Sequence, residues 1–349
     1  MGKIRVGILG ATGTVGQRFL QLLEHHPQFT VTALAASDRS QGRPYAEACA
    51  WRLPGAVPDG VRDLLVQAPE PPLDCDVVFS SLPSDVAGPV ETRFARAGYR
   101  VLTNSSPHRM DAAVPLLIPE VNPDHLVLLD ACKQTGGGFI VANPNCSTVM
   151  IALALAPLAA RFGVVAVVAT TLQAISGAGY PGVASLDITD NVVPFIAEEE
   201  EKIERETRRI LGSLNAGQVT PAAFAVSAQC HRVNVVDGHL AAVRVKLGRP
   251  AEPAELREAW ASFTGVPQAL RLPSAPERPI VVRDEPDRPQ PRLDRDAGRG
   301  MSVTVGRVAR DAVLGHRFVA LSHNTIRGAA GAALLNAELL LARGYLGAR

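Results

Sequence analysis

The stretch IRVGILGATGTVGQRFLQLL, residues 4–23, decides the fold. It opens with the apolar run Ile4–Leu9, continues through a glycine-rich turn and ends in apolar residues at helical spacing. A second apolar run, Val31–Ala36, follows it. Short apolar runs are typical of buried parallel strands, so the pattern predicts a strand–helix–strand unit with glycines at the first junction.

The glycine turn suits a pyrophosphate. Glycine lets the backbone approach the phosphates closely, and the start of the following helix stabilises their negative charge. The spacing is GxxGxxG rather than the commoner GxGxxG, and an ordinary tight turn would also account for the glycines. A strand precedes the turn, a helix follows it, and a second strand comes at the spacing of a strand–helix–strand unit. We therefore interpret the glycine turn as a dinucleotide-binding site.

The end of the second predicted strand bears on the type of cofactor. Sites that prefer NAD place an acidic residue there to bind the ribose 2′-hydroxyl. Here Ser37, Arg39 and Ser40 offer donors to a 2′-phosphate, which arginine binds through charge-assisted hydrogen bonds. Asp38 keeps NAD open, and a polar surface loop would have the same composition. The pattern favours NADP.

Two further strands are predicted over Cys75–Ser81 and Tyr99–Thr103. Both lead into small polar residues, as expected where the carboxyl ends of parallel strands line a cofactor crevice. The alternation of strands and helices predicts an α/β fold with a doubly wound parallel sheet through about residue 148.

Composition narrows the class of protein. The chain has 349 residues, enough for two domains at roughly 100–200 residues each, and it is 47% apolar and 20% charged. The net charge of +1 gives no reason to expect a nucleic-acid or membrane partner. Five cysteines without a CxxC pair argue against disulfides or a metal site and favour a reducing compartment. With no secretory signal at the amino terminus, we expect a cytoplasmic protein.

The stretch FIVANPNCST, residues 139–148, carries the strongest indication of chemistry. It has the pattern of a strand, a turn and the start of a buried helix, with Cys146 at the junction. The unpaired N–H groups and the positive end of the helix dipole favour a thiolate there, and the thiolate is the reactive form of cysteine. Free cysteine also packs as a small hydrophobe, so a structural role stays open at this point.

The second half of the chain supplies groups for acid–base chemistry and anion binding. A long apolar strand, residues 163–172, ends in the glycine-rich loop QAISGAGYPG, which either shapes a pocket or simply connects. The next helix opens with acidic residues, and a solvated face accounts for most of its charges. Further on, Arg232 ends one predicted strand and His239 begins another, with His231 alongside. Histidine suits proton transfer near neutral pH, although each alone would more often be a surface residue.

Two features are ambiguous from the sequence. Arg109 lies just beyond a predicted strand, where a single arginine is more often a solvated surface charge. Residues 267–300 are rich in Pro, Arg and Asp, which predicts an extended loop that serves as a lid or a subunit contact.

Several motifs in one order match a known family and together cover nearly the whole chain. They are GATGTVGQRF (10–19), SSLPSDVA (80–87), TNSSPHRM (103–110), PEVN (119–122), NPNCST (143–148), QAISGAG (173–179), EEEK (199–202), RVNVVDGH (232–239) and NTIRGAAG (324–331). On these motifs the chain resembles the aspartate-β-semialdehyde dehydrogenases, above all their archaeal and fungal branch. The motif around the cysteine and the spacing from Arg232 to His239 are the most specific pieces.

The resemblance implies roles for the residues of the catalytic motifs. Cys146 would form a thioester, His239 would act as acid and base, and Gln173 would position the acyl group. Arg232 would bind the α-carboxylate of the substrate, and Glu199 its amino group.

The same resemblance implies the phosphate and cofactor contacts. Arg109 and Lys202 would bind the phosphate, with Asn145 beside the cysteine. The remaining cofactor-binding candidates are Gly10, Thr12, Gly13, Thr14, Val15, Ser81, Ser176, Gly177 and Asn324.

The resemblance also implies an architecture and an activity. An NADP-binding Rossmann domain over residues 1–148 would be completed by a C-terminal helix within 325–349, and residues 149–324 would form an α+β catalytic and dimerisation domain. The activity would be the NADPH-dependent conversion of L-4-aspartyl phosphate to L-aspartate 4-semialdehyde and phosphate, in the biosynthesis of lysine, threonine, methionine and isoleucine. A homodimer or homotetramer is expected.

Other activities stay open. The family usually has RVPV where this chain has Asn234 two residues after Arg232, so the chemistry is better indicated than the exact substrate. Malonyl- or succinyl-CoA reductases can use the same cysteine and fold, but a substrate without an amino group would not need Glu199. N-acetylglutamyl-phosphate reductases are more distant. A silent NADP-binding regulator would not need the full set of catalytic side chains.

Overall fold

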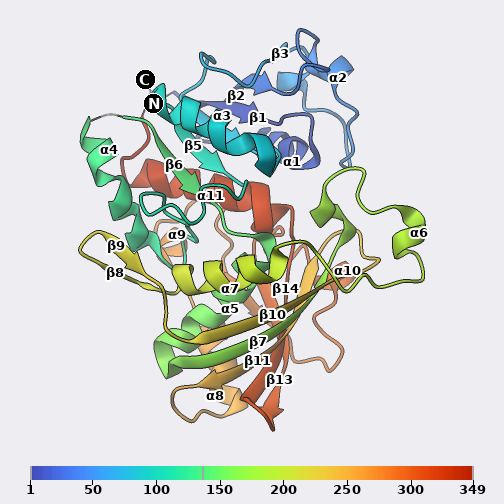
Figure 1. The fold of residues 1–349 in the computed structure, drawn as a ribbon, viewed down its shortest axis with the longest axis vertical. Helices are drawn as coiled ribbons and strands as arrows, with labels where there is room; N and C mark the ends of the chain where they lie inside the picture. The colour runs from blue at the N-terminus through green and yellow to red at the C-terminus, as the bar shows by residue number, and fades with distance from the viewer. Residues whose placement is uncertain (1, 136, 348–349) are drawn as a thin grey trace.

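Two six-stranded sheets, one above the other along the long axis, make up the molecule (Figure 1). The computed structural model describes residues 2–135 and 137–347. The first sheet comes from the first half of the chain and is wholly parallel, and the second comes from the second half and is mixed. Within the described part of the chain, no helix combines the length and apolar character that crossing a bilayer requires.

The first sheet has the strand order β3-β2-β1-β4-β5-β6, which is the order of a doubly wound dinucleotide-binding fold. The predicted parallel sheet is therefore confirmed. Its strands are β1 (Ile4–Leu9), β2 (Phe29–Ala35), β3 (Val66–Gln67), β4 (Val77–Ser80), β5 (Arg100–Thr103) and β6 (Phe139–Ala142). Helices α1 (Thr14–Leu23), α2 (Tyr45–Ala48), α3 (Ser84–Arg96) and α4 (Asp130–Thr135) lie in its connections, with 3₁₀ turns η1 (Asp59–Val61) and η2 (Pro123–Leu129).

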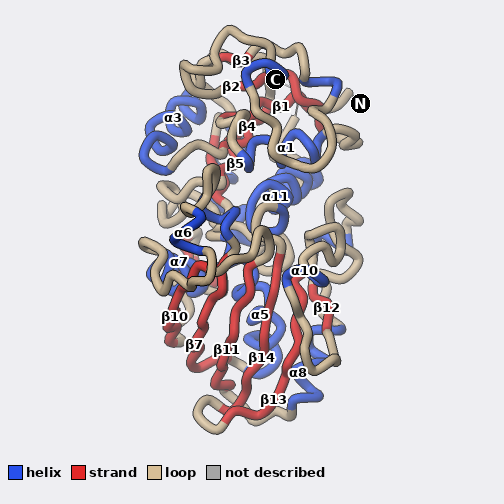
Figure 2. The backbone as a smooth tube through the Cα atoms, turned by 90° about the vertical axis from the view of Figure 1, so that its right-hand side faces the viewer, coloured by secondary structure: helices blue, strands red, loops and turns tan. Residues whose placement is uncertain are grey.

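The second sheet has the order β10-β7-β11-β14-β13-β12. Its strands are β7 (Val164–Gln173), β10 (Ala225–Arg232), β11 (His239–Leu247), β12 (Ile280–Val282), β13 (Val303–Asp311) and β14 (Gly315–Ser322). Helices α5 (Cys146–Phe162), α7 (Glu199–Ile210) and α8 (Pro253–Ala261) pack on one face. Figure 2 shows the opposite face toward the viewer, with α5 behind the strands. Val168 and Leu172 on this uncovered face are 40% and 38% exposed.

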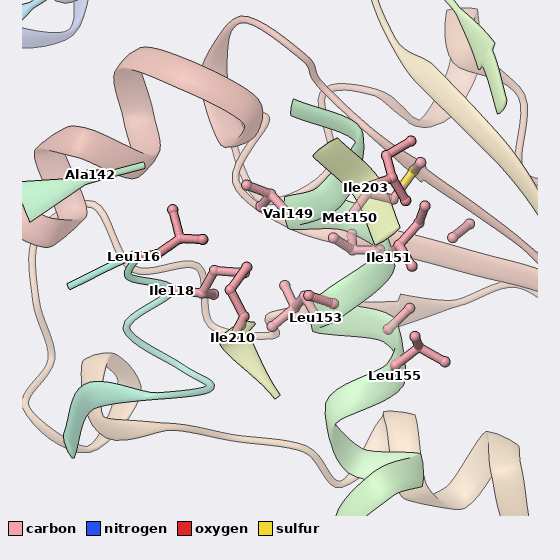
Figure 3. Close-up of a cluster of buried hydrophobic side chains, with 14 of the residues drawn as sticks. Leu116, Ile118, Ala142, Val149, Met150, Ile151, Leu153, Leu155, Ile203 and Ile210 are labelled. Atoms are coloured by element: carbon pink, nitrogen blue, oxygen red, sulfur yellow. The ribbon is translucent and has the colours of Figure 1, made fainter. Parts of the chain in front are cut away.

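Helix α5 is buried along most of its length, because nearly every residue from Val149 to Leu158 is apolar. Its side chains share one core with the segment after β5 and with α7 (Figure 3). The labelled members are Leu116, Ile118, Ala142, Val149, Met150, Ile151, Leu153, Leu155, Ile203 and Ile210. This packing fixes the start of α5, and hence Cys146, relative to both sheets.

The carboxyl-terminal segment returns to the first sheet, as expected. The π-helical turn η4 (Ile326–Ala330) leads into α11 (Gly331–Ala342), whose Leu334 and Leu339 join the core of β1. The helix is shorter than the predicted segment 325–349, because Gly344 adopts φ +71° and turns the chain away. Residues 348–349 lie outside the described part of the chain.

The extended loop predicted over residues 267–300 is confirmed only in part, because most of the segment is irregular but short elements interrupt it. The segment contains β12, which pairs with β13, and the short helices α9 (Val266–Ala269) and α10 (Pro291–Asp294). The fully buried carboxylate of Asp294 accepts hydrogen bonds from Arg283 Nε at 3.1 Å, Arg288 Nε at 2.7 Å and the Gln290 N–H at 2.7 Å. The hydrogen bonds of Asp294 therefore stabilise the fold of this segment. Between β7 and β11 lie the remaining small elements η3 (Ile175–Ala178), α6 (Ser185–Ile188), β8 (Ser213–Asn215) and β9 (Gln218–Thr220).

Candidate active site

A cleft of about 830 Å³ lies where the carboxyl ends of the first sheet meet α5 and the loops of the second sheet. It brings together most of the predicted site residues. Those that line it are Thr12, Gly13, Thr14, Val15, Ser40, Ser81, Arg109, Asn145, Cys146, Gln173, Ser176, Gly177, Glu199, Lys202, Arg232 and Asn324.

The glycine turn closes one end of the cleft by tight backbone packing. Gly10 has φ +77°, and a Cβ atom added there would lie 2.8 Å from the carbonyl oxygen of Ser81. A Cβ at Gly16 would lie 2.3 Å from the carbonyl oxygen of Gly10. Gly13 caps α1 without a side-chain hydrogen bond, so the first N–H groups of this helix have no side-chain cap. The turn thus offers helix N–H groups to an anion.

The end of β2 matches the prediction in part. Ser40 is buried and lines the cleft, whereas Ser37 and Arg39 are exposed and lie outside the lining. Sequence reasoning missed Arg52, which lines the same end of the cleft. Its guanidinium carbon lies 4.1 Å from the ring centroid of Tyr180, on the opposite wall. No periodic signal marks Arg52, because it follows α2 in an irregular segment.

Cys146 is the first residue of α5, as the sequence predicted. Asn145 caps the helix, because its Oδ1 accepts from the N–H groups of Ser147 at 2.9 Å and Thr148 at 3.2 Å. The close approach of η4 requires glycine at position 328, where a Cβ would lie 2.7 Å from the Cβ of Cys146. The cysteine is therefore held between a capped helix start and the return segment.

The expectation of a thiolate from the helix start alone is wrong for the ligand-free site. Burial, together with the negative charge of Glu199, raises the pKa of the Cys146 thiol to about 12. Arg109 and Arg232 act in the opposite direction, and so does the N–H of Ser147. Desolvation outweighs them, so the thiol is the resting form.

Glu199 joins two of the other predicted residues. Its Oε1 accepts from Asn145 Nδ2 at 2.6 Å, and its Oε2 accepts from Gln173 Nε2 at 2.9 Å. Both hydrogen-bond donors are neutral amides, and the carboxylate lies at the edge of the cleft, where Arg232 interacts with it electrostatically. Such a group suits an ammonium ligand.

His239 and Arg232 lie together under the loop that follows β7. The carbonyl oxygen of Ala174 accepts from Arg232 Nη1 at 2.8 Å, and the N–H of Ala174 donates to His239 Nδ1 at 3.0 Å. Burial, with Arg232 and His323 nearby, lowers the pKa of His239 to about 3, so the ring is neutral at pH 7. Because Nδ1 accepts a hydrogen bond, the neutral ring carries its proton on Nε2.

The loop passes so close to these two side chains that only glycine fits. A Cβ at Gly177 would lie 2.7 Å from Arg232 Nη1 and 3.1 Å from His239 Nε2. His239 itself is fully buried and is not part of the cleft lining. Its Nε2 has no hydrogen-bond partner within the described residues. The imidazole N–H is therefore available beneath the floor of the cleft.

Two cations lie at the α7 side of the cleft. Arg109 donates from Nη1 to Glu206 Oε1 at 3.0 Å and from Nη2 to the carbonyl oxygen of Asn104 at 2.7 Å. Lys202 pairs with Glu198 at 3.1 Å. Arg109 is buried rather than solvated, which decides the ambiguity left by the sequence. Glu206 was missed by sequence reasoning.

Asn324 connects the loop that follows β7 to the turn that precedes β11. Its Oδ1 accepts from the N–H of Gly238 at 2.8 Å, and its Nδ2 donates to Ser176 Oγ at 2.8 Å. Asn234, the departure from the family motif, is exposed and lies outside the cleft lining. The departure from the motif therefore lies outside the cleft.

The fold and the cleft define a dinucleotide-binding oxidoreductase, and the comparisons with known proteins narrow the class. The model of the family described as semialdehyde dehydrogenase, NAD binding domain, matches residues 5–129. The model described as semialdehyde dehydrogenase, dimerisation domain, matches residues 155–327.

Relatives and solved structures agree. An aspartate-semialdehyde dehydrogenase from Methanothermobacter thermautotrophicus is 53% identical, over 97% of this chain and 99% of the relative. One from Archaeoglobus fulgidus is 51% identical, over 97% of this chain and 98% of the relative. The crystal structure of an aspartate-semialdehyde dehydrogenase with NADP from Candida albicans superposes with a TM-score of 0.92 at 44% identity, covering 99% and 100% of the two chains. The chain belongs to the aspartate-semialdehyde dehydrogenase family, and the predicted resemblance is confirmed.

Proposed function

We propose that this chain catalyses the NADPH-dependent reductive dephosphorylation of L-4-aspartyl phosphate to L-aspartate 4-semialdehyde, through a thioester on Cys146. The observation that carries the proposal is one cleft that holds the start of α5, the glycine turn and two buried arginines, Arg109 and Arg232. The reaction serves the biosynthesis of lysine, threonine, methionine and isoleucine.

The glycine turn fits a dinucleotide. The tight contacts of Gly10 and Gly16 leave the N–H groups at the start of α1 facing the cleft, and we assign the pyrophosphate to residues 12–15. Ser40 and Arg52 lie at the same end of the cleft and suit the adenosine half. When bound, NADPH supplies the hydride that converts the thioester to the aldehyde.

The remaining chemistry belongs to the side chains of this chain. The sulfur of Cys146 attacks the acyl carbon as its thiol proton passes to the phosphate oxygen, the bond between the acyl carbon and that oxygen breaks, and phosphate leaves toward Arg109 and Lys202, whose charges stabilise it. The Nε2–H of His239, which has no partner within the described residues and lies beside Gly177 of the cleft lining, donates to the carbonyl oxygen as negative charge develops there. Gln173, held by Glu199, positions the acyl group.

Substrate recognition rests on opposite charges at the two ends of a small amino acid. Arg232 is the cation for the α-carboxylate, and Glu199 is the anion for the α-amino group. A malonyl- or succinyl-CoA substrate has no amino group, so it would form no ion pair with the carboxylate of Glu199. This asymmetry favours aspartyl phosphate over the acyl-CoA alternatives.

We also propose that the chain assembles as a homodimer or homotetramer. The support is the uncovered face of the second sheet, with Val168 and Leu172 exposed, in a region matched by a dimerisation-domain model. Light scattering should give a mass of two or four chains. Val168→Lys should shift the population toward monomer if this face is the interface, and an unchanged mass would refute the assignment.

The proposal is tested by a substrate panel and by one substitution. The wild-type chain should reduce NADP with aspartate semialdehyde only when phosphate is present, and it should not oxidise NADPH with malonyl-CoA or succinyl-CoA. Cys146→Ala should lower kcat by about a thousandfold or more, because the covalent route is lost. Activity of Cys146→Ala near wild type would refute the thioester mechanism. Turnover with an acyl-CoA alone would favour the alternative.

A further inference from the structure

Helix α7 directs one charged face toward the site. Glu199, Lys202, Glu206 and Arg209 follow one another at intervals of three, four and three residues, which places them on one side of a helix. The first two line the cleft, and the last two are buried behind it. The buried pair has no role in the reaction as derived above.

We propose that Glu206 is a positioning residue that fixes the phosphate-binding Arg109 against the turn that carries Cys146. Glu206 is 2% exposed. Its Oε1 accepts from Arg109 Nη1 at 3.0 Å, and its Oε2 accepts from the main-chain N–H of Asn145 at 2.6 Å. The inference rests on the proposed function, because it assigns phosphate to Arg109.

The two hydrogen bonds couple the cation to the nucleophile. Asn145 caps α5, so its N–H cannot shift without moving the start of the helix and Cys146. Arg109 is held from two sides, by Glu206 and by the carbonyl oxygen of Asn104. One carboxylate thus sets the distance between the group that receives the phosphate and the sulfur that displaces it.

The electrostatics explain why a carboxylate is suitable here. A buried guanidinium without a counter-ion is costly, and a buried carboxylate needs partners on both oxygens. Glu206 meets both requirements and leaves Arg109 oriented before the ligand arrives, which lowers the ordering cost of binding. Arg209 supports the same segment from behind, because it donates to the carbonyl oxygens of Asp111 at 2.7 Å and Val114 at 3.1 Å.

Glu206→Gln tests the coupling with little change in volume. Glutamine keeps one acceptor oxygen but presents an NH₂ group to the other donor, so either Arg109 or the Asn145 N–H loses its partner. Glu204→Gln is the matched control, because Glu204 lies on the same helix and accepts from the N–H of Ala228 at 3.1 Å, away from the cleft lining.

The first readout does not depend on turnover. Iodoacetamide alkylation of Cys146 is followed by mass spectrometry at increasing inorganic phosphate, which should protect the thiol by occupying Arg109. In Glu206→Gln the half-protecting phosphate concentration should rise about tenfold, the loss expected for one charge-assisted hydrogen bond. The KM for phosphate should rise by the same factor, with the KM for NADP unchanged. Glu204→Gln should match the wild type in both.

A double-mutant cycle with Arg109→Lys separates positioning from general damage. If Glu206 acts through Arg109, the double variant should need about the same phosphate as Arg109→Lys alone, since both changes remove one interaction. Phosphate protection of Glu206→Gln within twofold of wild type, additive effects in the cycle, or a wild type insensitive to phosphate would each overturn the inference. A wild type that phosphate protects but that never turns over would refute the proposed function and leave this inference standing.

Discussion

The two ends of the cleft are built on different physical principles. We call the end at the glycine turn, residues 10–16, the cofactor end, and the end around Cys146, Glu199 and Arg232 the substrate end. At the cofactor end, backbone packs on backbone, and Gly10 and Gly16 are needed because any side chain would collide. At the substrate end, buried charges are held by hydrogen bonds, with Glu199 and Glu206 each bridging two partners from separate elements. The difference teaches that shape determines one ligand site and charge balance the other.

Among changes that compare the two ends, the largest effect is expected from a steric change at the charged end. A methyl group at Gly177 would displace Arg232 or the ring of His239, and a shift of about 1 Å in such groups can cost a hundredfold in rate. We therefore expect Gly177→Ala to lower kcat about a hundredfold, measured under saturating substrates. If kcat is retained and only the KM for NADP rises, Gly177 serves the cofactor alone, and the two ends are less distinct than the structure indicates.

A steric change at the cofactor end should have the converse signature. Gly16→Ala places a methyl group against the carbonyl oxygen of Gly10 and forces the turn open. Overpacking of this kind costs about 1–3 kcal/mol, so the KM for NADP should rise about tenfold while kcat at saturation changes little. Gly60→Ala, in open space, is the control. A fall in kcat with an unchanged KM for NADP would contradict the assignment of steric packing to the cofactor end.

The cofactor end was largely predictable from the sequence, because its determinants are local. The run from Ile4 to Leu23 contains strand, turn and helix, and the parallel sheet follows from the alternation of strands and helices that continues to residue 142. The residues at the end of β2 were predicted only in part, since Ser40 lines the cleft but Ser37 and Arg39 are exposed, while Arg52 lines the cleft. Arg52 approaches through a loop, and loops carry no periodic signal.

The substrate end was predictable as a set of residues but not as a network. Cys146, Arg232 and His239 were found through motifs, yet the pKa of the cysteine depends on burial, which a sequence does not display. Glu206 looks like one more charge on an acidic helix. Its spacing from Glu199 and Lys202 was the available signal, but only contact with Arg109 distinguishes it from a solvated carboxylate.

A smaller effect is expected on the pH dependence of stability. It should come from buried imidazoles on the His239 side of the cleft. Burial lowers the pKa of His239 to about 3 and that of His323 to about 4, below the value of 6.5 for an unperturbed imidazole. As pH falls below about 6.5, the unfolded chain takes up protons that the folded chain does not, so each ring reduces the free energy of unfolding by up to about 1.4 kcal/mol per pH unit. Above that pH both rings are neutral in the folded and the unfolded chain, so they cost no stability, and the loss grows as the pH falls toward the folded-state pKa values.

Urea unfolding between pH 7.5 and pH 4.5 measures this dependence. His239→Gln should unfold with a shallower dependence on pH than the wild type. His25→Gln, at an exposed position, should not change the slope. An unchanged slope in His239→Gln would mean that the imidazole is solvated in the folded chain.

The smallest effect is expected where the two ends meet. Arg52 on the cofactor side lies 4.1 Å from the ring centroid of Tyr180 on the substrate side, and Tyr180 is 64% exposed. An exposed cation–π contact contributes about 0.5–1 kcal/mol, so Arg52→Ala should raise the KM for NADP about two- to fivefold with kcat unchanged. Arg62→Ala, on an exposed residue outside the cleft lining, is the matched control. A rise in KM for NADP, but not for NAD, well above tenfold would instead make Arg52 the cation for the 2′-phosphate. In that case, charge as well as shape would govern ligand binding at the cofactor end.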